Sequence, residues 1–462
     1  MKIPFVGGAY SGPSTNLDSQ ICQNLYPVFD KEGGKVAAMR NTPGLTLLSQ
    51  ATNGEVRGIE VMEDNLYAVI EDRLFRFNST GSYILIAGIL LTHNGLVWMA
   101  NNGTQIMIVD GHYGYIMSGT TLTKITDSDF PTPSSLTYQD GYFIVSSANT
   151  GRFYICDSYD GTTWDSLDFA TAESYPDNLQ TVISAHQELW LIGKGSYEVW
   201  YNSGATFPFN RIAGAVNKVG TIAPHSGAQY QGTVFWLDNN RCVQMSLGYQ
   251  TQKISTEQID YQLQQYSTVT DAIGFCYQQE GHAFYVLTFP TESKTWVYDG
   301  VTQIWHTRAS GASDTRHRAN CYAFFEGKHI VGDFENGTLY EYDLSAYDDD
   351  GTTLRRIRAA QAVHEERKNL FHHQLEIEFE AGVGLTSGQG VDPQAMLQWS
   401  DDGGHTWGNE HWTTIGALGK YKNRAIWRRL GKSRDRVYKL TITDPVKVAM
   451  IGAYLDAELA NL

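Results

Sequence analysis

The sequence predicts an all-β protein, a β-propeller of about seven blades with a small C-terminal β-sandwich. Two observations lead to this prediction: the composition, and a strand pattern that recurs at near-constant spacing. The 462 residues include 45 Gly, 27 Tyr and 11 Trp, an abundance that is typical of strands joined by tight turns. Length alone would allow one large domain or several ordinary ones.

The recurring pattern is a polar turn that is followed each time by a short apolar strand. A second strand follows soon after, so that each unit contains a hairpin. Seven four-stranded units of this kind, arranged in a ring, make a β-propeller. A series of hairpins in two stacked sandwiches is the alternative, and the near-constant spacing of 38 to 49 residues between turns argues against it. The turns end at Asn65, Gly103, Gly141, Glu188, Gly232, Gly281 and Gly327.

The chain divides into four predicted parts. These are an N-terminal arm (1–53) that closes or flanks the propeller, the propeller itself (54–345), a charged linker (346–371) and the β-sandwich (372–462). The linker is predicted from its Asp-rich start and its many charges, and it has room for one short helix. Strand patterns then resume, and about six strands in the last ninety residues suit a small β-sandwich.

The net charge of −16 is unevenly distributed. Residues 1–345 carry 19 Lys and Arg against 34 Asp and Glu, whereas residues 346–462 carry 15 against 16. An acidic body is a poor ligand for the phosphates of nucleic acid. The acidity therefore either serves solubility alone or provides a surface past which DNA slides without sticking.

The cysteines and the apolar segments indicate a soluble protein that is made in a reducing compartment. The five cysteines are scattered and lack any C-x-x-C spacing, so neither a disulfide framework nor a zinc site is predicted. The N-terminal apolar stretch is too short for a signal peptide, and the longest apolar run, 83–91, is about half a membrane span. We therefore expect synthesis in the cytoplasm and no membrane insertion.

Two segments match the Asp-box pattern S-x-D-x-G-x-T-W, one of them in shortened form. In such a turn the carboxylate accepts backbone N–H groups and the Trp packs beneath. Asp-boxes occur in sialidase propellers away from the catalytic centre, and we interpret both as structural turns. The full match contains Ser400, Asp402, Gly404, Thr406 and Trp407, and the shortened one contains Asp160 and Trp164.

No catalytic residue, metal site or cofactor is predicted. The Asp-Asp-Asp-Gly sequence at 348–351 lacks the alternating ligand spacing of a calcium loop, and a solvated linker is the favoured interpretation. His372 and His373 are adjacent on a predicted strand and so point to opposite faces. A sialidase-like propeller that binds or cleaves glycans is the alternative function, but it requires three clustered arginines and a Tyr activated by Glu. The propeller half has few arginines at matching places.

The segment 420–439 is strongly basic, with Asp435 as its one acidic residue. It is predicted to face an acidic partner or DNA phosphates, because arginine makes forked contacts with carboxylate and phosphate alike. A solvent-facing side of two strands is the competing interpretation. The partner-contact candidates are Lys420, Lys422, Arg424, Arg428, Arg429, Lys432, Arg434 and Arg436.

Motifs at both ends of the chain resemble the packaged-DNA stabilisation proteins, the tail hub (nozzle-type tail accessory) proteins of short-tailed bacteriophages. The middle of the chain matches only as a strand pattern. The motifs are 23–27 (QNLYP), 42–45 (TPGL), 57–58 (RG), 399–404 (WSDDGG), 425–431 (AIWRRLG) and 439–443 (KLTIT).

The resemblance implies a non-enzymatic virion protein that is assembled in the host cytoplasm. It implies a homo-oligomeric ring of six copies below the portal and its adaptor, which retains packaged DNA and extends the ejection channel without sequence-specific DNA binding. It also implies a platform for tailspikes or tail fibres and for a tail needle or plug. Residues 420–439 are then the expected partner face.

Overall fold

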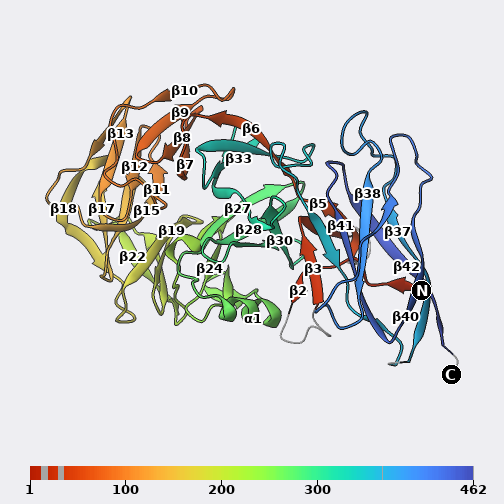
Figure 1. Cartoon of the computed structure of the whole chain (residues 1–462). Helices are drawn as coiled ribbons and strands as arrows, with labels where there is room; N and C mark the ends of the chain where they lie inside the picture. Colours follow the sequence, from red (N-terminus) through yellow and green to blue (C-terminus); the bar gives the residue numbers. More distant parts are fainter. Residues whose placement is uncertain (12–18, 30–35, 367, 461–462) are drawn as a thin grey trace.

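The computed structural model describes residues 1–11, 19–29, 36–366 and 368–460. Parts of the predicted arm (12–18 and 30–35), one residue of the predicted linker and the last two of the predicted sandwich lie outside the described residues. Strands make up 57% of the chain and helices 3%. The predicted all-β class, with a propeller and a sandwich, is confirmed (Figure 1).

The propeller has seven blades of four antiparallel strands each. Six blades are separate sheets, and the strands of blade 6 belong to a larger sheet that continues into the sandwich. Blade 1 contains β7 (Val56–Met62), β8 (Asn65–Ile70), β9 (Arg73–Phe77) and β10 (Tyr83–Leu85). Blade 2 contains β11 (Trp98–Asn101), β12 (Gln105–Val109), β13 (Gly114–Ser118) and β14 (Thr121–Lys124). Blade 3 contains β15 (Pro133–Gln139), β16 (Tyr142–Ser147), β17 (Arg152–Asp157) and β18 (Asp160–Thr171).

The next blades follow in chain order. Blade 4 contains β19 (Leu179–Ala185), β20 (Glu188–Gly193), β21 (Tyr197–Asn202) and β22 (Phe209–Asn217). Blade 5 contains β23 (Ala228–Tyr230), β24 (Thr233–Leu237), β25 (Val243–Leu247) and β26 (Gln250–Lys253). Blade 6 contains β27 (Ile273–Gln279), β28 (His282–Phe289), β29 (Lys294–Asp299) and β30 (Ile304–Ser310), with β31 (Thr315–Arg316) paired to β30.

Blade 7 is built from both ends of the propeller sequence. Its first three strands are β32 (Ala319–Phe325), β33 (Lys328–Asp333) and β34 (Thr338–Asp343), and its fourth is β6 (Gly44–Gln50) from the N-terminal arm. The first strands of neighbouring blades contact one another around the ring, and β32 contacts β7. The chain therefore closes the propeller by pairing its early strand β6 with its late strand β34.

The arm also enters the sandwich, whose first sheet has the order β4-β5-β42-β37-β40 with β1 paired to β42. These strands are β1 (Lys2–Ile3), β4 (Leu25–Phe29), β5 (Val36–Asn41), β37 (Leu370–Phe379), β40 (Ala425–Ser433) and β42 (Ala449–Leu459). Both chain ends consequently lie at the sandwich (Figure 1).

The second sheet of the sandwich is continuous with blade 6. Its order is β30-β3-β35-β41-β38-β39, with β2 paired to β3 and β36 to β41. These strands are β2 (Tyr10–Ser11), β3 (Ser19–Gln23), β35 (Arg356–Ala359), β36 (Val363–His364), β38 (Gln394–Ser400), β39 (His411–Thr414) and β41 (Asp435–Ile442). Strands β35 and β36 thus lie inside the predicted linker (346–371), and its described residues contain none of the helix for which the sequence left room.

One apolar core runs from blades 5 and 6 into the sandwich. It joins Leu237 and Trp305 of the propeller to Phe5 of the arm and to Leu375 and Leu440 of the two sandwich sheets. Arg358, fully buried on β35, holds the arm in place by donating to the carbonyl oxygens of Phe5 at 2.6 Å and Gly8 at 2.7 Å. The remaining blades pack pairwise through smaller clusters of their own.

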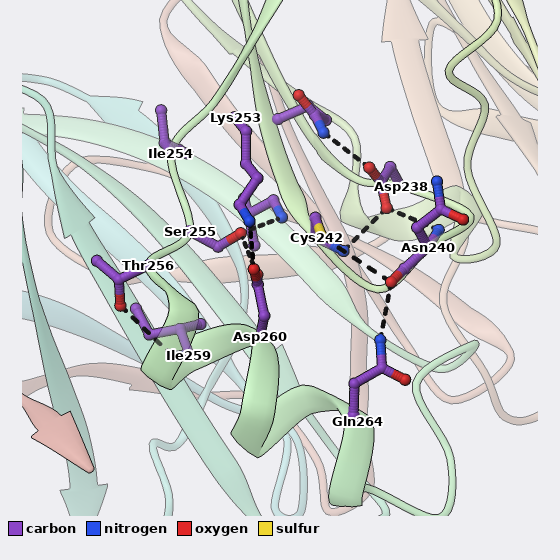
Figure 2. A network of polar contacts seen from close by, with 12 residues as sticks. Asp238, Asn240, Cys242, Lys253, Ile254, Ser255, Thr256, Ile259, Asp260 and Gln264 are labelled. Carbon is purple, nitrogen blue, oxygen red and sulfur yellow. Dashed lines mark hydrogen bonds and ion pairs between the residues drawn. The ribbon is translucent and has the colours of Figure 1, made fainter. Parts of the chain in front are cut away.

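A short 3₁₀ helix, η1 (Pro224–Ser226), precedes blade 5, and the helix α1 (Glu257–Gln265) follows it. Figure 2 shows the side chains of Lys253 and Ser255 directed at Asp260 on the helix. Thr256 caps the helix N-terminus, where its side chain accepts the Ile259 N–H. The helix thereby covers blade 5 on the side where the arm strand β2 approaches.

Candidate partner interface

The basic segment spans strands β40 and β41, which follow each other in the chain but belong to opposite sheets of the sandwich. Strand β40 is an edge strand and pairs only with β37. Its register shifts opposite His372 and Gln374, and Arg429 adopts a φ of 59°. This bulge interrupts the normal alternation, so that Arg428 and Arg429 are both exposed.

Arg436 does not belong to a partner face, and the prediction for this residue is wrong. Its side chain is 2% exposed and makes a forked pair with Asp401, at 2.6 Å from Nε to Oδ1 and 2.8 Å from Nη2 to Oδ2. It also donates to the Leu430 carbonyl and lies 5.2 Å from the Trp399 ring centre. Arg436 therefore connects the Asp-box turn to both sheets instead of facing outward.

Arg424 is exposed but already has a partner. Its guanidinium makes a forked pair with the carboxylate of Glu376 on β37. The distance from Nε to Oε1 is 2.7 Å, and Nη2 donates to Oε2. Lys432 lies 5.5 Å from the ring centre of the exposed Phe371, which leaves its charge open to solvent.

Six predicted candidates remain exposed, and in the described part of the chain none of them forms an ion pair. We call these six residues the basic edge. They run along β40 and through the loop before it and the turn after it, so they form one side of the sandwich. Their assignment to a partner stays a prediction. The basic edge consists of Lys420, Lys422, Arg428, Arg429, Lys432 and Arg434.

A pocket of about 760 Å³ opens beside the first two residues of the basic edge. Its surface is mostly apolar, and Tyr421, which is 76% exposed, is one of its lining residues. One carboxylate lines it, that of Asp392, which accepts from the Thr414 hydroxyl and from Gln394 Nε2. The lining residues are Asp392, Thr414, Gly416, Ala417, Gly419, Lys420, Tyr421, Lys422 and Asn423.

The full Asp-box forms a closed hydrogen-bonded turn between β38 and β39. The Asp402 carboxylate accepts from the Thr406 N–H at 2.9 Å and from the Ser400 hydroxyl at 2.6 Å, and Gly404 N–H donates to Ser400 Oγ. These bonds, that from Ser400 first, hold the pKa of Asp402 well below its usual range. Trp407 is only partly covered, and Lys439 Nζ lies 4.1 Å from its ring centre.

The shortened box begins strand β18 of blade 3. Asp160 accepts from the N–H and hydroxyl of Thr162 at 2.9 and 2.6 Å. Trp164 is buried and donates from Nε1 to the Gly161 carbonyl at 2.9 Å. In both boxes the carboxylate bonds to its own turn, as a structural role requires, and that role stays a prediction.

The other polar segments that the sequence pointed out do not assemble a site. Asp349 is buried against the Ser310 hydroxyl, while Asp348 accepts the N–H of Gly351. Across 1–11, 19–29, 36–366 and 368–460, no group of three or more His, Cys, Asp or Glu side chains is placed to hold a metal ion. Over the same residues, no helix has the length and apolar character needed to cross a membrane.

The propeller arginines are used inside the blades. Arg57 donates to the carbonyl oxygens of Gly95 at 2.5 Å and of Glu71 and Thr92 at 2.8 Å. Arg308 is buried among aromatic rings, 5.3 Å from that of Tyr277. These two guanidiniums are therefore not directed at a shared substrate carboxylate.

The axis of the propeller is blocked by a contact that the sequence did not indicate. Trp98 on β11 of blade 2 stacks on His225 of η1 beside blade 5, with ring centres 3.7 Å apart and planes at 19°. Burial lowers the pKa of His225 to about 3, so its ring is neutral near pH 7. Trp98 lines two cavities, of about 190 and 490 Å³. Neither residue lies in a motif, and only the ring brings them together.

Strand β18 carries a second feature that the sequence did not indicate, an acidic protrusion. Its pairing with β17 is interrupted between Trp164 and Phe169, so residues 165–168 bulge outward. Leu167 at the tip is 78% exposed, between Asp165 and Asp168. Partial burial, and then the charges of Asp165 and Asp157, raise the pKa of Asp168. We call residues 165–168 the acidic knob.

Two family models match the chain, and both describe the same family. The model described as bacteriophage P22 Gp10, beta-propeller, matches residues 1–347, and the model described as bacteriophage P22 Gp10, beta-sandwich, matches residues 355–458. No curated protein sequence matches the chain.

Several solved structures are similar at low identity. The Pan2 WD40 domain of Neurospora crassa has a TM-score of 0.42 and 7% identity over 65% of this chain and 96% of that one. The N-terminal domain of Nup159 has a TM-score of 0.39 and 7% identity over 70% of this chain and 98% of that one.

Proposed function

This chain belongs to the bacteriophage P22 Gp10 family of tail hub proteins, and from this membership we propose that it forms a ring on the tail axis below the portal. It is a structural protein of the phage tail and so a component of the virion. In the proposed ring the copies surround and extend the DNA exit channel and retain the packaged genome until ejection.

The observation that carries this proposal, beside the family, is the closed propeller axis. Trp98 and His225 meet across it at 3.7 Å, which leaves no passage for a nucleic acid through a single copy. A DNA channel built from this protein must therefore be enclosed by several copies. Identical subunits that contact one another head to tail enclose such a space when the rotation from each copy to the next adds up to one full turn.

The charge distribution supports a channel past which DNA moves freely. Residues 1–345 carry 15 more acidic than basic residues, 34 against 19. An acidic wall avoids the phosphate contacts that give other proteins tight, salt-sensitive DNA binding. We propose that part of this acidic surface faces the channel and that the basic edge faces protein.

The remaining partners follow from the same assignment. A ring below the portal contacts the portal-bound adaptor above, and its outer and lower surfaces provide places for tailspikes or fibres and for a needle or plug. Catalysis has no part in this proposal. A fluorogenic sialoside or a capsule polysaccharide, turned over by the purified protein, would contradict it.

The test is electron cryo-microscopy of purified tailed particles. We expect density for this chain as a closed ring that is coaxial with the portal, with six copies as the number implied by the family. The acidic face should line the channel. Density away from the axis, or an open arrangement of copies, would overturn the proposal.

A further inference from the structure

The acidic knob and the pocket beside the basic edge are opposite in charge, and each has an apolar part. The knob presents the exposed Leu167 between two carboxylates. The pocket has a mostly apolar surface and a volume of about 760 Å³, with Lys420 and Lys422 beside it. An apolar side chain that enters an apolar pocket, with opposite charges around it, is the usual composition of a specific protein contact.

Neither side is neutralised within its own chain. Among the residues that the structure describes, Asp157, Asp165 and Asp168 form no ion pair, and neither do Lys420 and Lys422. The carboxylate of Asp392 inside the pocket already accepts from Thr414 and Gln394, and it lies among the lining residues with the two lysines. The unpaired charges therefore remain available to a partner of opposite sign.

The two features cannot meet within one molecule. Blade 3, which carries β18, lies at one end of the molecule, and the sandwich lies at the opposite end (Figure 1). A contact between them must join two copies through different surfaces. Such heterologous contacts produce a closed ring when the rotation from each copy to the next adds up to one full turn.

We propose that Leu167 of one copy inserts into the pocket of the next copy, with Asp165 and Asp168 beside Lys420 and Lys422. This inference rests on the proposed ring and names the surfaces that hold it together. The occupant of the pocket is thus a second copy of this chain, oriented head to tail.

The first test is a cysteine pair, Leu167→Cys with Ala417→Cys, placed in one chain and oxidised in assembled tails. We expect a ladder of cross-linked multimers that ends at the ring size. When two chains with one substitution each are co-assembled, the ladder should stop at dimers. Leu247→Cys with Ala417→Cys is the matched control, because Leu247 is similarly exposed but lies on blade 5. The unsubstituted chain reports any contribution of its five native cysteines.

The outcomes separate this inference from the proposed function. A closed ring in the micrographs without a ladder would overturn the knob and pocket contact while the ring stands. A cross-link to a different tail protein would overturn it as well. Absence of any ring from unsubstituted particles would overturn both proposals.

A charge exchange provides a second, independent measurement. Asp165→Lys with Asp168→Lys should strongly reduce the yield of tailed particles, because lysine then faces lysine. Adding Lys420→Asp and Lys422→Asp to the same chain should restore the yield. Circular dichroism of each isolated variant checks that it is folded. Failure of the fourfold variant to recover, with its fold intact, would contradict the contact.

Discussion

Arg434 and Arg436 lie two positions apart in the sequence, yet the fold gives them opposite surroundings. Arg434 is in the exposed turn between β40 and β41, whereas Arg436 is buried against Asp401 and the Trp399 ring. Both are basic residues in the same basic run. The difference arises because Arg434 lies in the turn before β41, whereas Arg436 lies within β41, where nearly all side chains are buried.

Replacing Arg436 by Ala should lower the free energy of unfolding by about 2 kcal/mol, less than for a fully buried pair because Asp401 is half exposed. Arg434→Ala is the control and should change it by less than about 0.5 kcal/mol. Urea unfolding followed by tryptophan fluorescence measures both. Equal midpoints for the two variants would contradict the structural role of Arg436.

Asp349 provides a pH-dependent prediction. Burial raises its pKa to about 7, above the value of about 4 in an unfolded chain. The folded state therefore holds this proton more tightly, so the stabilisation is complete below about pH 4 and is lost as the pH rises towards 7.

Asp349→Asn should flatten the dependence of the melting temperature on pH between 4 and 7 and raise the melting temperature at pH 8. The amide oxygen can still accept from the Ser310 hydroxyl. Asp350→Asn is the matched control, because Asp350 is exposed and Asn tolerates its φ of 48°. Parallel profiles for Asp349→Asn and the unsubstituted chain would exclude the assignment.

At the scale of elements, strand β6 determines whether the propeller is closed. It pairs with β34 over its whole length, from Gly44 opposite Asp343 to Gln50 opposite Thr338. Gly44 is required at its start, because a Cβ there would lie 2.3 Å from the Asp348 carbonyl oxygen. The next residue, Leu45, is buried between blades 6 and 7, while Leu47 is half exposed.

Leu45→Ala should lower the free energy of unfolding by about 2 to 4 kcal/mol, because the smaller side chain leaves a cavity between blades 6 and 7, where the ring is closed. Leu47→Ala is the control on the same strand and should change stability by less than about 0.5 kcal/mol. Limited proteolysis should also cut Leu45→Ala first near blade 7. The prediction fails if both variants melt together with the unsubstituted chain.

At the scale of the whole molecule, acidic and basic surfaces lie at opposite ends of the fold. The acidic propeller carries the knob at one end, and the sandwich carries the basic edge at the other (Figure 1). Electrostatic complementarity of this kind steers association and selects partners more than it adds affinity. Assembly should therefore depend on the basic edge even though folding does not.

Reversing Arg428 and Arg429 to Glu should reduce the number of assembled tails, through lost forked pairs with partner carboxylates, and leave the isolated protein folded. Lys194→Glu, on the exposed surface of the propeller, is the control. If these arginines hold DNA instead, assembly will be normal and the heads will leak. Counting tailed, DNA-filled particles by electron microscopy distinguishes the partner role from DNA binding, and circular dichroism checks that the isolated variant is folded. A number of tails equal to that of the unsubstituted protein would exclude the partner role.

The sequence by itself determined the properties that repeat locally. Turn and strand periodicity predicted the propeller, the Asp-box spacing predicted two tight turns, and the counts of charged residues predicted an acidic body with a basic segment. These follow from the sequence because hydrogen bonding in hairpins and alternation along strands act over a few residues.

Only the tertiary structure decided which distant segments meet. It placed β6 in blade 7 and β3 between blade 6 and the sandwich, stacked Trp98 on His225, and buried Arg436 while exposing Arg428. Some of these contacts join positions more than three hundred residues apart, as where Ile21 pairs with Ala359, and no local pattern encodes the partner of an edge strand. The reason is physical: an open strand edge and an uncovered apolar face pair with whichever complementary surface the completed ring brings to them.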